Sequence, residues 1–199
     1  MKQNFDLILA SSSPIRKKIL TDLGLNFKII KPDFDESAAL KEISALPIKE
    51  QALFLARGKA LSLGITDDNI FIISSDQICQ LDKKIINKSA DKHEAIKQLQ
   101  KLNGKIHYQN NAVCLYRGRR ELFCHFERAK LKMRKLSNRE IEDYVNSDQS
   151  WNCAGSYKFE SLGKNLFSEV KGNYNCILGM AIEPIINFLQ QNKLIILGN

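Results

Sequence analysis

The sequence has few of the residues that interrupt a chain. Only 4 of its 199 residues are proline and 10 are glycine, and we find no low-complexity stretch, internal repeat or Pro/Gly/Ser-rich linker. Long apolar runs are missing as well: residues 7–10 are far too few for a signal peptide or a membrane-spanning helix. The sequence therefore predicts a soluble, cytoplasmic chain that is long enough to bury a sizeable core.

Cysteine is scarce, and its spacing is irregular. The five cysteines are odd in number and none has CxxC spacing, which argues against a disulfide scaffold or a structural zinc site. We expect buried free thiols in a reducing compartment. The histidines, His93, His107 and His125, show no ligand spacing, so we expect surface or structural roles for them. Cys124 precedes His125 directly, and on a strand the two would point to opposite faces, which argues against a thiol–imidazole dyad.

Positive charge is in excess. Lysine and arginine number 30 against 22 acidic residues, a net charge of +8, which favours an anionic partner. Basic residues are densest in residues 117–139, where nine stand against two glutamates. Because only Phe123 and Phe126 interleave with this run as stacking aromatics, both an exposed basic strand and a nucleic-acid-binding surface remain open.

Hydrophobic periodicity alternates between helix and strand along the chain. Helical spacing predicts helices at residues 14–23, 48–63, 90–102, 137–144 and 182–191. Compact or alternating apolar segments predict strands at residues 7–10, 27–30, 71–75, 85–86, 107–116 and 121–133. We therefore expect an α/β (mixed α+β) fold: a mixed, partly antiparallel, twisted sheet flanked by helices, with a cleft between two lobes.

The stretch LILASSSPIRKKIL, residues 7–20, predicts a strand, a serine-rich turn and a helix. Ser13 is placed to cap the helix, and Pro14 falls at the first helical position, where its missing N–H costs nothing. A helix N-terminus after a strand is a ready anion site, and Arg16 in the first turn has the fork geometry that phosphate oxygens favour. An ordinary cap followed by a solvated basic helix face remains the alternative.

Two carboxylates and two lysines are further candidates. Asp76, in SSDQICQLD, follows a buried strand and could coordinate Mg²⁺ or orient a water, or it could simply begin a turn. Glu36 belongs to an acidic loop, where a carboxylate is commonly solvated. Lys59 lies on the apolar face of its helix, so it either reaches into a cleft or snorkels to solvent. Lys88 is a weak signal when taken alone.

The segment CAGSYKFESLG, residues 153–163, contains two glycines, which predicts a loop with a defined conformation. Its Glu160 could accept hydrogen bonds from the N1–H and exocyclic amine of guanine. An exposed charge without a binding role is the alternative.

Taken in order, these segments resemble the Maf family of nucleotide pyrophosphatases. The resemblance covers nearly the whole chain. It rests on LILASSSPIRKKIL, DFDE, LARGKA, SSDQICQLDKKIINKS, EAIKQLQKLNGKIH, CAGSYKFESLG and GNYNCILGMAI. It implies one Maf-like nucleotide pyrophosphatase domain over residues 1–199. The implied reaction hydrolyses a nucleoside triphosphate between its α- and β-phosphates, which cleanses the nucleotide pool of modified triphosphates.

The resemblance also implies roles for individual residues. Asp76 would be the catalytic base or a metal-bound carboxylate, and Glu36 would help it hold a divalent cation, Mg²⁺ or Mn²⁺. The implied phosphate-binding residues are Ser13, Arg16, Lys59 and Lys88. The partners implied are a small nucleotide and a possible homodimer, with no membrane and no stable nucleic-acid partner.

Ile15, Gln77 and Glu160 fall at positions that resemble the family's specificity determinants. SDQICQLD and CAGSYKFE are similar to the branch that acts on 7-methyl-GTP, whereas the dTTP/UTP branch typically has a DT pair and a later Gln. Ile15 departs from the 7-methyl-GTP branch, which tends to place an aromatic there. The alternatives are the same reaction on dTTP, UTP or another modified nucleotide, or a non-catalytic basic module that binds nucleic acid or regulates septum formation.

Overall fold

The computed structural model describes residues 2–196, and within them the chain divides into two compact units. The first unit is built from residues 2–76, 111–127 and 179–196. The second unit is built from residues 77–110 and 128–178. A single domain over residues 1–199 stays a prediction beside this division.

A mixed sheet organises the described residues. Its strand order is β3-β2-β4-β6-β7-β8, and β5 pairs with β4. The strands are β2 (Asp6–Ala10), β3 (Lys28–Ile30), β4 (Ile70–Leu81), β5 (Lys84–Ile86), β6 (Ile106–Arg117), β7 (Arg120–Met133) and β8 (Phe167–Lys171). β2 is parallel to β3 and β4, whereas β5 is antiparallel to β4 and β8 to β7. The predicted mixed, partly antiparallel sheet with flanking helices is confirmed.

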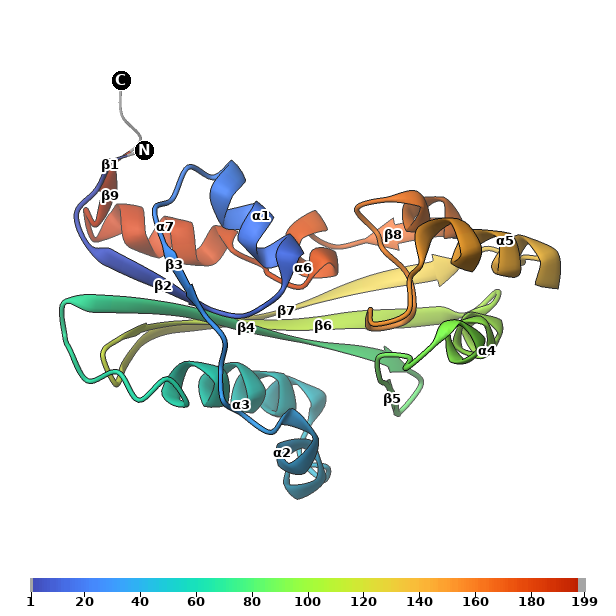
Figure 1. The fold of residues 1–199 in the computed structure, drawn as a ribbon, viewed down its shortest axis with the longest axis horizontal. Coiled ribbons are helices and arrows are strands. Elements are labelled where there is room, and N and C mark those ends of the chain that lie inside the picture. Colours follow the sequence, from blue (N-terminus) through green and yellow to red (C-terminus); the bar gives the residue numbers. More distant parts are fainter. Residues whose placement is uncertain (1, 197–199) are drawn as a thin grey trace. The chain divides into compact units, whose positions relative to one another are not determined.

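The first unit has helices on both faces of its strands. They are α1 (Pro14–Asp22), α2 (Glu36–Glu42), α3 (Ile48–Leu61) and α7 (Glu183–Gln191). Figure 1 shows α1 and α7 on one face of β2 and β4, and α3 on the other. Residues 7–10 of β2 are all buried. A parallel strand that is covered on both faces buries the side chains of both faces, which explains why this run is continuously apolar. Beside this sheet, β1 (Lys2–Gln3) pairs antiparallel with β9 (Ile195–Ile196).

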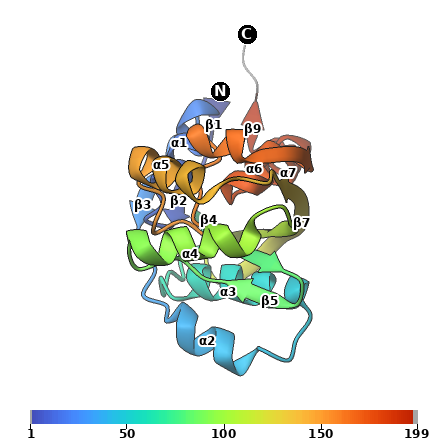
Figure 2. The same ribbon diagram turned by 90° about the vertical axis from the view of Figure 1, so that its right-hand side faces the viewer.

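In the second unit one helix precedes β6 along the chain and the others follow β7. They are α4 (Lys92–Leu102), α5 (Asn138–Asp148), the 3-10 helix η1 (Leu162–Leu166) and α6 (Tyr174–Leu178). Helices α4 and α5 lie side by side (Figure 2). A capping box opens α5, where a helix was predicted: the Ser137 hydroxyl accepts from the Glu140 N–H, and the Glu140 carboxylate accepts from the Ser137 N–H.

Two expectations about local structure were wrong. The strand predicted at residues 71–75 continues as β4 to Leu81, so Asp76 lies inside a strand and does not begin a turn. The acidic loop ends earlier than expected, because Asp35 caps α2 by accepting from the backbone N–H groups of Ser37 and Ala38. Glu36 is therefore the first residue of a helix.

The expectation that all cysteines are free thiols was also wrong. Cys114 on β6 and Cys124 on β7 form a disulfide, with their Cα atoms 4.2 Å apart. The two strands are neighbours in the sheet and are joined through residues 118–119, so cysteines near this end of both strands lie close enough to bond. Cys79 and Cys176 are buried free thiols, as predicted, and Cys153 is a half-buried free thiol.

None of the helices described between residues 2 and 196 is both long enough and apolar enough to span a bilayer.

Candidate functional site

Lys59 is the centre of a buried charge cluster in the first unit. Its Nζ contacts a carboxylate oxygen of Asp76 and lies 3.0 Å from a carboxylate oxygen of Glu36. The side chains of Lys59 and Asp76 are only 7% and 5% exposed, whereas that of Glu36 is 48% exposed. The structure thus brings together three of the residues predicted from the sequence, and it shows that Lys59 does not snorkel to solvent.

Helix α3 is held against β4 at the point where Lys59 must enter the cluster. The Ser74 hydroxyl of β4 donates to the Ala56 carbonyl of α3 over 2.7 Å. Ala56 and Ala60, on either side of Lys59, are buried. Small residues on this face let the helix approach the strand closely, so that the lysine stem reaches Asp76 along apolar surface.

A glycine in α3 accommodates the segment that carries Glu36. A Cβ atom built at Gly58 would lie 2.4 Å from the Phe34 ring, which is far inside van der Waals contact. Only glycine therefore allows this ring to pack against the helix. Because Phe34 precedes the capped start of α2, the ring contact and the Asp35 cap together place Glu36 beside Lys59.

The predicted strand, serine turn and helix are present at residues 6–22. Ser13 occupies the N-cap position of α1, although its side chain makes no capping hydrogen bond, and Pro14 begins the helix. Arg16 Nε donates to the Gly179 carbonyl over 2.9 Å, and Arg16 Nη1 lies 3.4 Å from the Ser11 hydroxyl. Ile15 is half-buried. The guanidinium is thus anchored on its Nε side by the backbone of the same unit.

Electrostatics link Arg16 to the carboxylates. Burial raises the pKa of the Asp76 carboxyl above its ordinary value, and the positive charges of Lys59 and Arg16 oppose that rise. Burial lowers the pKa of Arg16, and the charges of Asp76 and Glu36 oppose that change. The guanidinium nonetheless stays charged at neutral pH. The cluster therefore pairs two carboxylates with two cations in partly buried surroundings.

Two polar residues that the sequence analysis missed fix the backbone at Asp76. Asn111 Nδ2 donates to the Asp76 carbonyl over 2.7 Å and lies 3.0 Å from the Ser75 hydroxyl. The Asn111 Oδ1 atom accepts from the Ala181 N–H over 2.7 Å. The Ser75 hydroxyl lies 2.9 Å from the same Gly179 carbonyl that Arg16 contacts. The pair of asparagines at 110–111, directly before the apolar run 112–116 of the predicted strand, was the available signal.

The remaining predicted residues lie in the second unit. Gln77 follows Asp76 on β4, and its amide donates to the carbonyls of Cys176 and Ile177 over 3.1 and 2.7 Å. Lys88 and Glu160 are both exposed. Both act on the half-buried thiol of Cys153: burial and Glu160 raise its pKa, whereas Lys88 opposes the rise. The structure thus brings Lys88 and Glu160 to the surroundings of one residue.

A buried network shapes the loop that carries Glu160. The Tyr157 hydroxyl accepts from the Gln109 amide over 2.7 Å and lies 2.9 Å from His107 Nε2. Gly155 has φ of +82°, and a Cβ there would lie 2.8 Å from the Tyr157 ring, so glycine is required at this position. Burial lowers the pKa of His107 to about 4, so the imidazole is neutral and structural, as expected.

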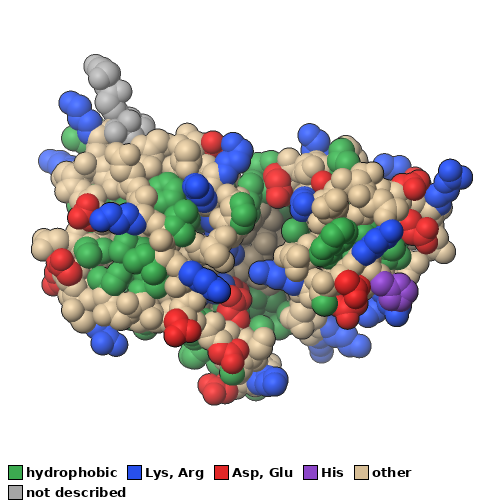
Figure 3. Space-filling view, in the orientation of Figure 1, with side chains coloured by type: hydrophobic (Ala, Val, Ile, Leu, Met, Phe, Trp, Pro, Cys, Tyr) green, Lys and Arg blue, Asp and Glu red, His purple; other side chains and the backbone are tan. Residues whose placement is uncertain are grey.

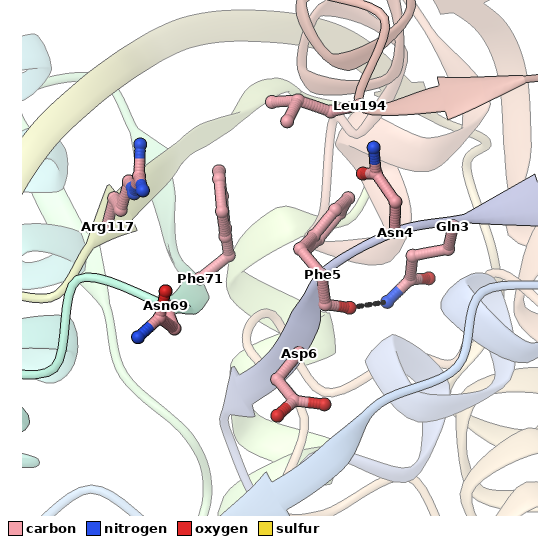
Figure 4. Close-up of a pocket in the computed structure, with 8 residues that line it drawn as sticks. All are labelled: Gln3, Asn4, Phe5, Asp6, Asn69, Phe71, Arg117 and Leu194. Atoms are coloured by element: carbon pink, nitrogen blue, oxygen red, sulfur yellow. Dashed lines mark hydrogen bonds between the residues drawn. The ribbon is translucent and has the colours of Figure 1, made fainter.

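A cavity elsewhere in the first unit shares no residue with the charge cluster. It measures about 560 Å³, and its lining includes the rings of Phe5 and Phe71 and the guanidinium of Arg117 (Figure 4). Arg117 lies over the Phe71 ring, 5.7 Å from its centroid. The cavity lies beside Asp6, where β2 begins, whereas Ser11 follows the last residue of that strand.

The excess positive charge is spread out. Figure 3 shows lysine and arginine side chains scattered over the face in view, with acidic side chains among them. Two of the basic residues on β7, Arg128 and Lys130, contact Tyr108 and Glu169 of the second unit. On this face, net charge does not collect into a single stripe.

Carboxylate oxygens, an ammonium and a guanidinium thus lie on an α/β scaffold, and cations with carboxylates beside them are suited to an anionic ligand. The family model described as Maf-like protein matches residues 6–192, and the chain belongs to the Maf family.

Relatives align along nearly the full length of the chain. The nucleoside triphosphate pyrophosphatase of Legionella pneumophila strain Philadelphia 1 is 34% identical over 193 residues, which cover 97% of this chain and 96% of that protein. The 7-methyl-GTP pyrophosphatase of Aliivibrio fischeri is 35% identical over 193 residues, which cover 96% and 98%. Among solved structures, a HAM1 protein from Coxiella burnetii matches 65% of this chain and 73% of its own, with a TM-score of 0.41 and 14% identity.

Proposed function

We propose that this chain is a nucleoside triphosphate pyrophosphatase, which hydrolyses the bond between the α- and β-phosphates to give a monophosphate and pyrophosphate. The observation that carries the proposal is the cluster of Lys59, Asp76 and Glu36, with Arg16 coupled to it electrostatically. Family membership and the names of the relatives support the same reaction. Free nucleotides are the substrate, so we also propose that the protein acts in the cytoplasm.

Asp76 is the proposed base. Its carboxylate is held by Lys59 and by the hydrogen-bonded backbone of β4, so it does not reorganise when a water approaches. In the reaction, Asp76 orients the water and takes its proton while the water oxygen bonds to phosphorus. The phosphoanhydride bond then breaks, and its electrons leave on the released phosphate oxygen.

Ser13, Arg16, Lys59 and Lys88 are the proposed phosphate-binding residues. The Gly179 carbonyl holds Arg16 through Nε, which leaves the Nη groups to donate to phosphate oxygens. The N–H groups at the start of α1 and the Ser13 hydroxyl add donors beside it. Lys59 supplies charge from inside the cluster. Binding energy on the triphosphate then places the reacting phosphorus near Asp76.

The cluster fits a divalent cation such as Mg²⁺ or Mn²⁺. Asp76 and Glu36 each place a carboxylate oxygen beside the same atom, Lys59 Nζ, so the two carboxylates lie close together. Mg²⁺ prefers one or two carboxylates together with substrate phosphates. Between residues 2 and 196, no group of three potential metal ligands within mutual reach includes Asp76 or Glu36, so the cluster is no closed cage. When bound by Asp76 and Glu36, the cation would neutralise phosphate charge.

We propose 7-methyl-GTP as the preferred substrate, read by Ile15, Gln77 and Glu160. The similarity to the Aliivibrio fischeri protein supports this choice. A carboxylate accepts from the N1–H and exocyclic amine of guanine, and its charge favours the cationic base that N7 methylation creates. Glu160 is exposed, so it is accessible to a base.

Two assays test these proposals separately. Pyrophosphate and orthophosphate release are measured with Mg²⁺ on GTP, 7-methyl-GTP, dTTP, UTP and CTP. Release of pyrophosphate supports the reaction. Release of orthophosphate alone contradicts the reaction. Release of neither product contradicts it as well and favours the alternative, a non-catalytic binding module. The Glu160→Gln variant then addresses the base: an unchanged ranking of substrates would show that Glu160 does not read it.

A further inference from the structure

The disulfide between Cys114 and Cys124 has one inaccessible and one accessible sulfur. Cys114 is fully buried. Cys124 is partly exposed and lines a cavity of about 350 Å³ in the first unit. A small thiol that enters this cavity can therefore reach the sulfur of Cys124, while access to Cys114 is blocked by the fold.

Basic side chains surround the accessible sulfur. Lys49 and Arg57 of α3 line the cavity together with His125 of β7, against a single carboxylate, Glu121. Glu121 and Arg57 neutralise each other: Arg57 binds the carboxylate through two hydrogen bonds of 2.8 and 3.1 Å, and the Tyr116 hydroxyl donates to it over 2.8 Å. Lys49 is then the further cation of the lining. The lining is thus suited to a small molecule that carries carboxylates of its own.

We propose that Cys124 is a thiol–disulfide exchange site for a small anionic thiol of the glutathione class, with Cys114 as the resolving cysteine. Disulfides in reducing compartments are characteristically transient, catalytic or redox-sensing. A disulfide with one cysteine that lines a basic cavity has the accessibility that such exchange requires. The reducing compartment rests on the proposed cytoplasmic function, whereas the exchange chemistry is independent of the pyrophosphatase reaction.

The exchange balances in two steps. The Cys124 thiolate attacks one sulfur of glutathione disulfide, whose S–S bond breaks, and one glutathione thiolate leaves with the electron pair. The Cys114 thiolate then attacks Cys124 Sγ in the mixed disulfide and releases the second glutathione thiolate. The two cysteine protons end on the two released thiolates, so two cysteines are oxidised and one glutathione disulfide is reduced. The reverse sequence opens the bond by attack at Cys124.

The first experiment locates the reacting sulfur. Reduced Cys114→Ser and Cys124→Ser proteins are treated with glutathione disulfide, and adducts are located by peptide mass mapping. We expect a stable mixed disulfide at Cys124 in Cys114→Ser and none at Cys114 in Cys124→Ser. Wild type should lose two of its five thiols, with Cys79, Cys153 and Cys176 unmodified. Equal labelling at both positions, or labelling at neither, overturns the proposal.

The second experiment tests the basic lining. Oxidation rates of reduced wild type are compared for glutathione disulfide, which is anionic, and cystamine, which is cationic. The ratio of the two rates should exceed one at low salt and fall by about threefold in Lys49→Gln, because one cation of the cavity is lost. Lys83→Gln, in an exposed turn of the second unit, is the matched control and should leave the ratio unchanged. A ratio at or below one, or an equal effect of both variants, contradicts the proposal; circular dichroism of each variant shows that it is folded.

Discussion

At the scale of single residues, the site depends on how burial and charge oppose each other at Asp76. Removal from water disfavours the charged carboxylate and raises its pKa, whereas the positive charges of Lys59 and Arg16 favour the carboxylate and oppose that rise. A carboxyl whose pKa is raised stays partly protonated to higher pH than an exposed aspartate. If it is the base, its protonation switches the enzyme off on the acid side.

This balance predicts the pH profile. We expect kcat/KM to fall as the pH drops through an apparent pKa that lies above the ordinary value of 3.8. Removal of a cation that lowers this pKa should move the acid limb to higher pH, so Arg16→Gln shifts it upward. Lys17→Gln changes a neighbouring exposed lysine and should leave the limb in place. A limb that stays fixed in Arg16→Gln, or moves to lower pH, contradicts the assignment.

The same balance has a consequence for stability. Because the folded-state pKa of Asp76 is raised, the folded protein binds more protons than the unfolded chain above pH 3.8. Its contribution to the free energy of unfolding is therefore present below the unfolded pKa and is lost as the pH rises through the folded one.

At the scale of elements, the contact between α3 and the segment before α2 rests on a glycine. Alanine at an interior helical position normally stabilises by about 0.5–1 kcal/mol relative to glycine. At Gly58 the added methyl would collide with the Phe34 ring, so Gly58→Ala should instead lower the free energy of unfolding by about 1–3 kcal/mol.

Chemical denaturation of four proteins checks this prediction: wild type, Gly58→Ala, Phe34→Ala and the double variant. In the Phe34→Ala background the ring is absent, so Gly58→Ala should become neutral or stabilising. An equal effect of Gly58→Ala in both backgrounds would show that Phe34 is not what the glycine accommodates.

The β6–β7 hairpin should depend on its cross-link. The cysteines are 10 residues apart in sequence, and closing a short loop of this kind stabilises by about 2–4 kcal/mol. We expect reduction to lower the free energy of unfolding by that order. The urea midpoint of wild type, measured with and without dithiothreitol, tests this prediction. In the control protein Cys114→Ser, dithiothreitol should leave the midpoint unchanged.

The elements also show what could be predicted from sequence. The turn at residues 11–13 and the helix after it were predictable because their signals are local: a residue at the cap position, a proline at the first helical position and a glycine after the last turn of the helix. The extension of β4 was not, because the polar run 74–76 is buried only through distant partners, Ala56, Ala112 and Lys59. The disulfide likewise depends on the pairing of β6 with β7, which the spacing of the cysteines in the sequence does not reveal.

At the scale of the whole molecule, the predicted site residues divide between the two units. Ser13, Ile15, Arg16, Glu36, Lys59 and Asp76 belong to the first unit, and Gln77, Lys88 and Glu160 to the second. Each unit thus contributes to both proposed roles, with Lys88 as the phosphate-binding residue of the second unit and Ile15 as the base-reading residue of the first. Substitutions at Arg16, Lys59 or Asp76 should lower turnover on every nucleotide, and substitutions at Glu160 should change the order of substrates.

The most direct test of the pyrophosphatase proposal is pyrophosphate release by Asp76→Asn, beside wild type and the exposed control Asp22→Asn. We predict that Asp76→Asn loses at least roughly 100-fold in kcat while it still binds nucleotide, because a positioned base contributes about that factor. Asp22→Asn should match wild type. Turnover by Asp76→Asn within a few-fold of wild type would contradict the account of the cluster as the catalytic centre.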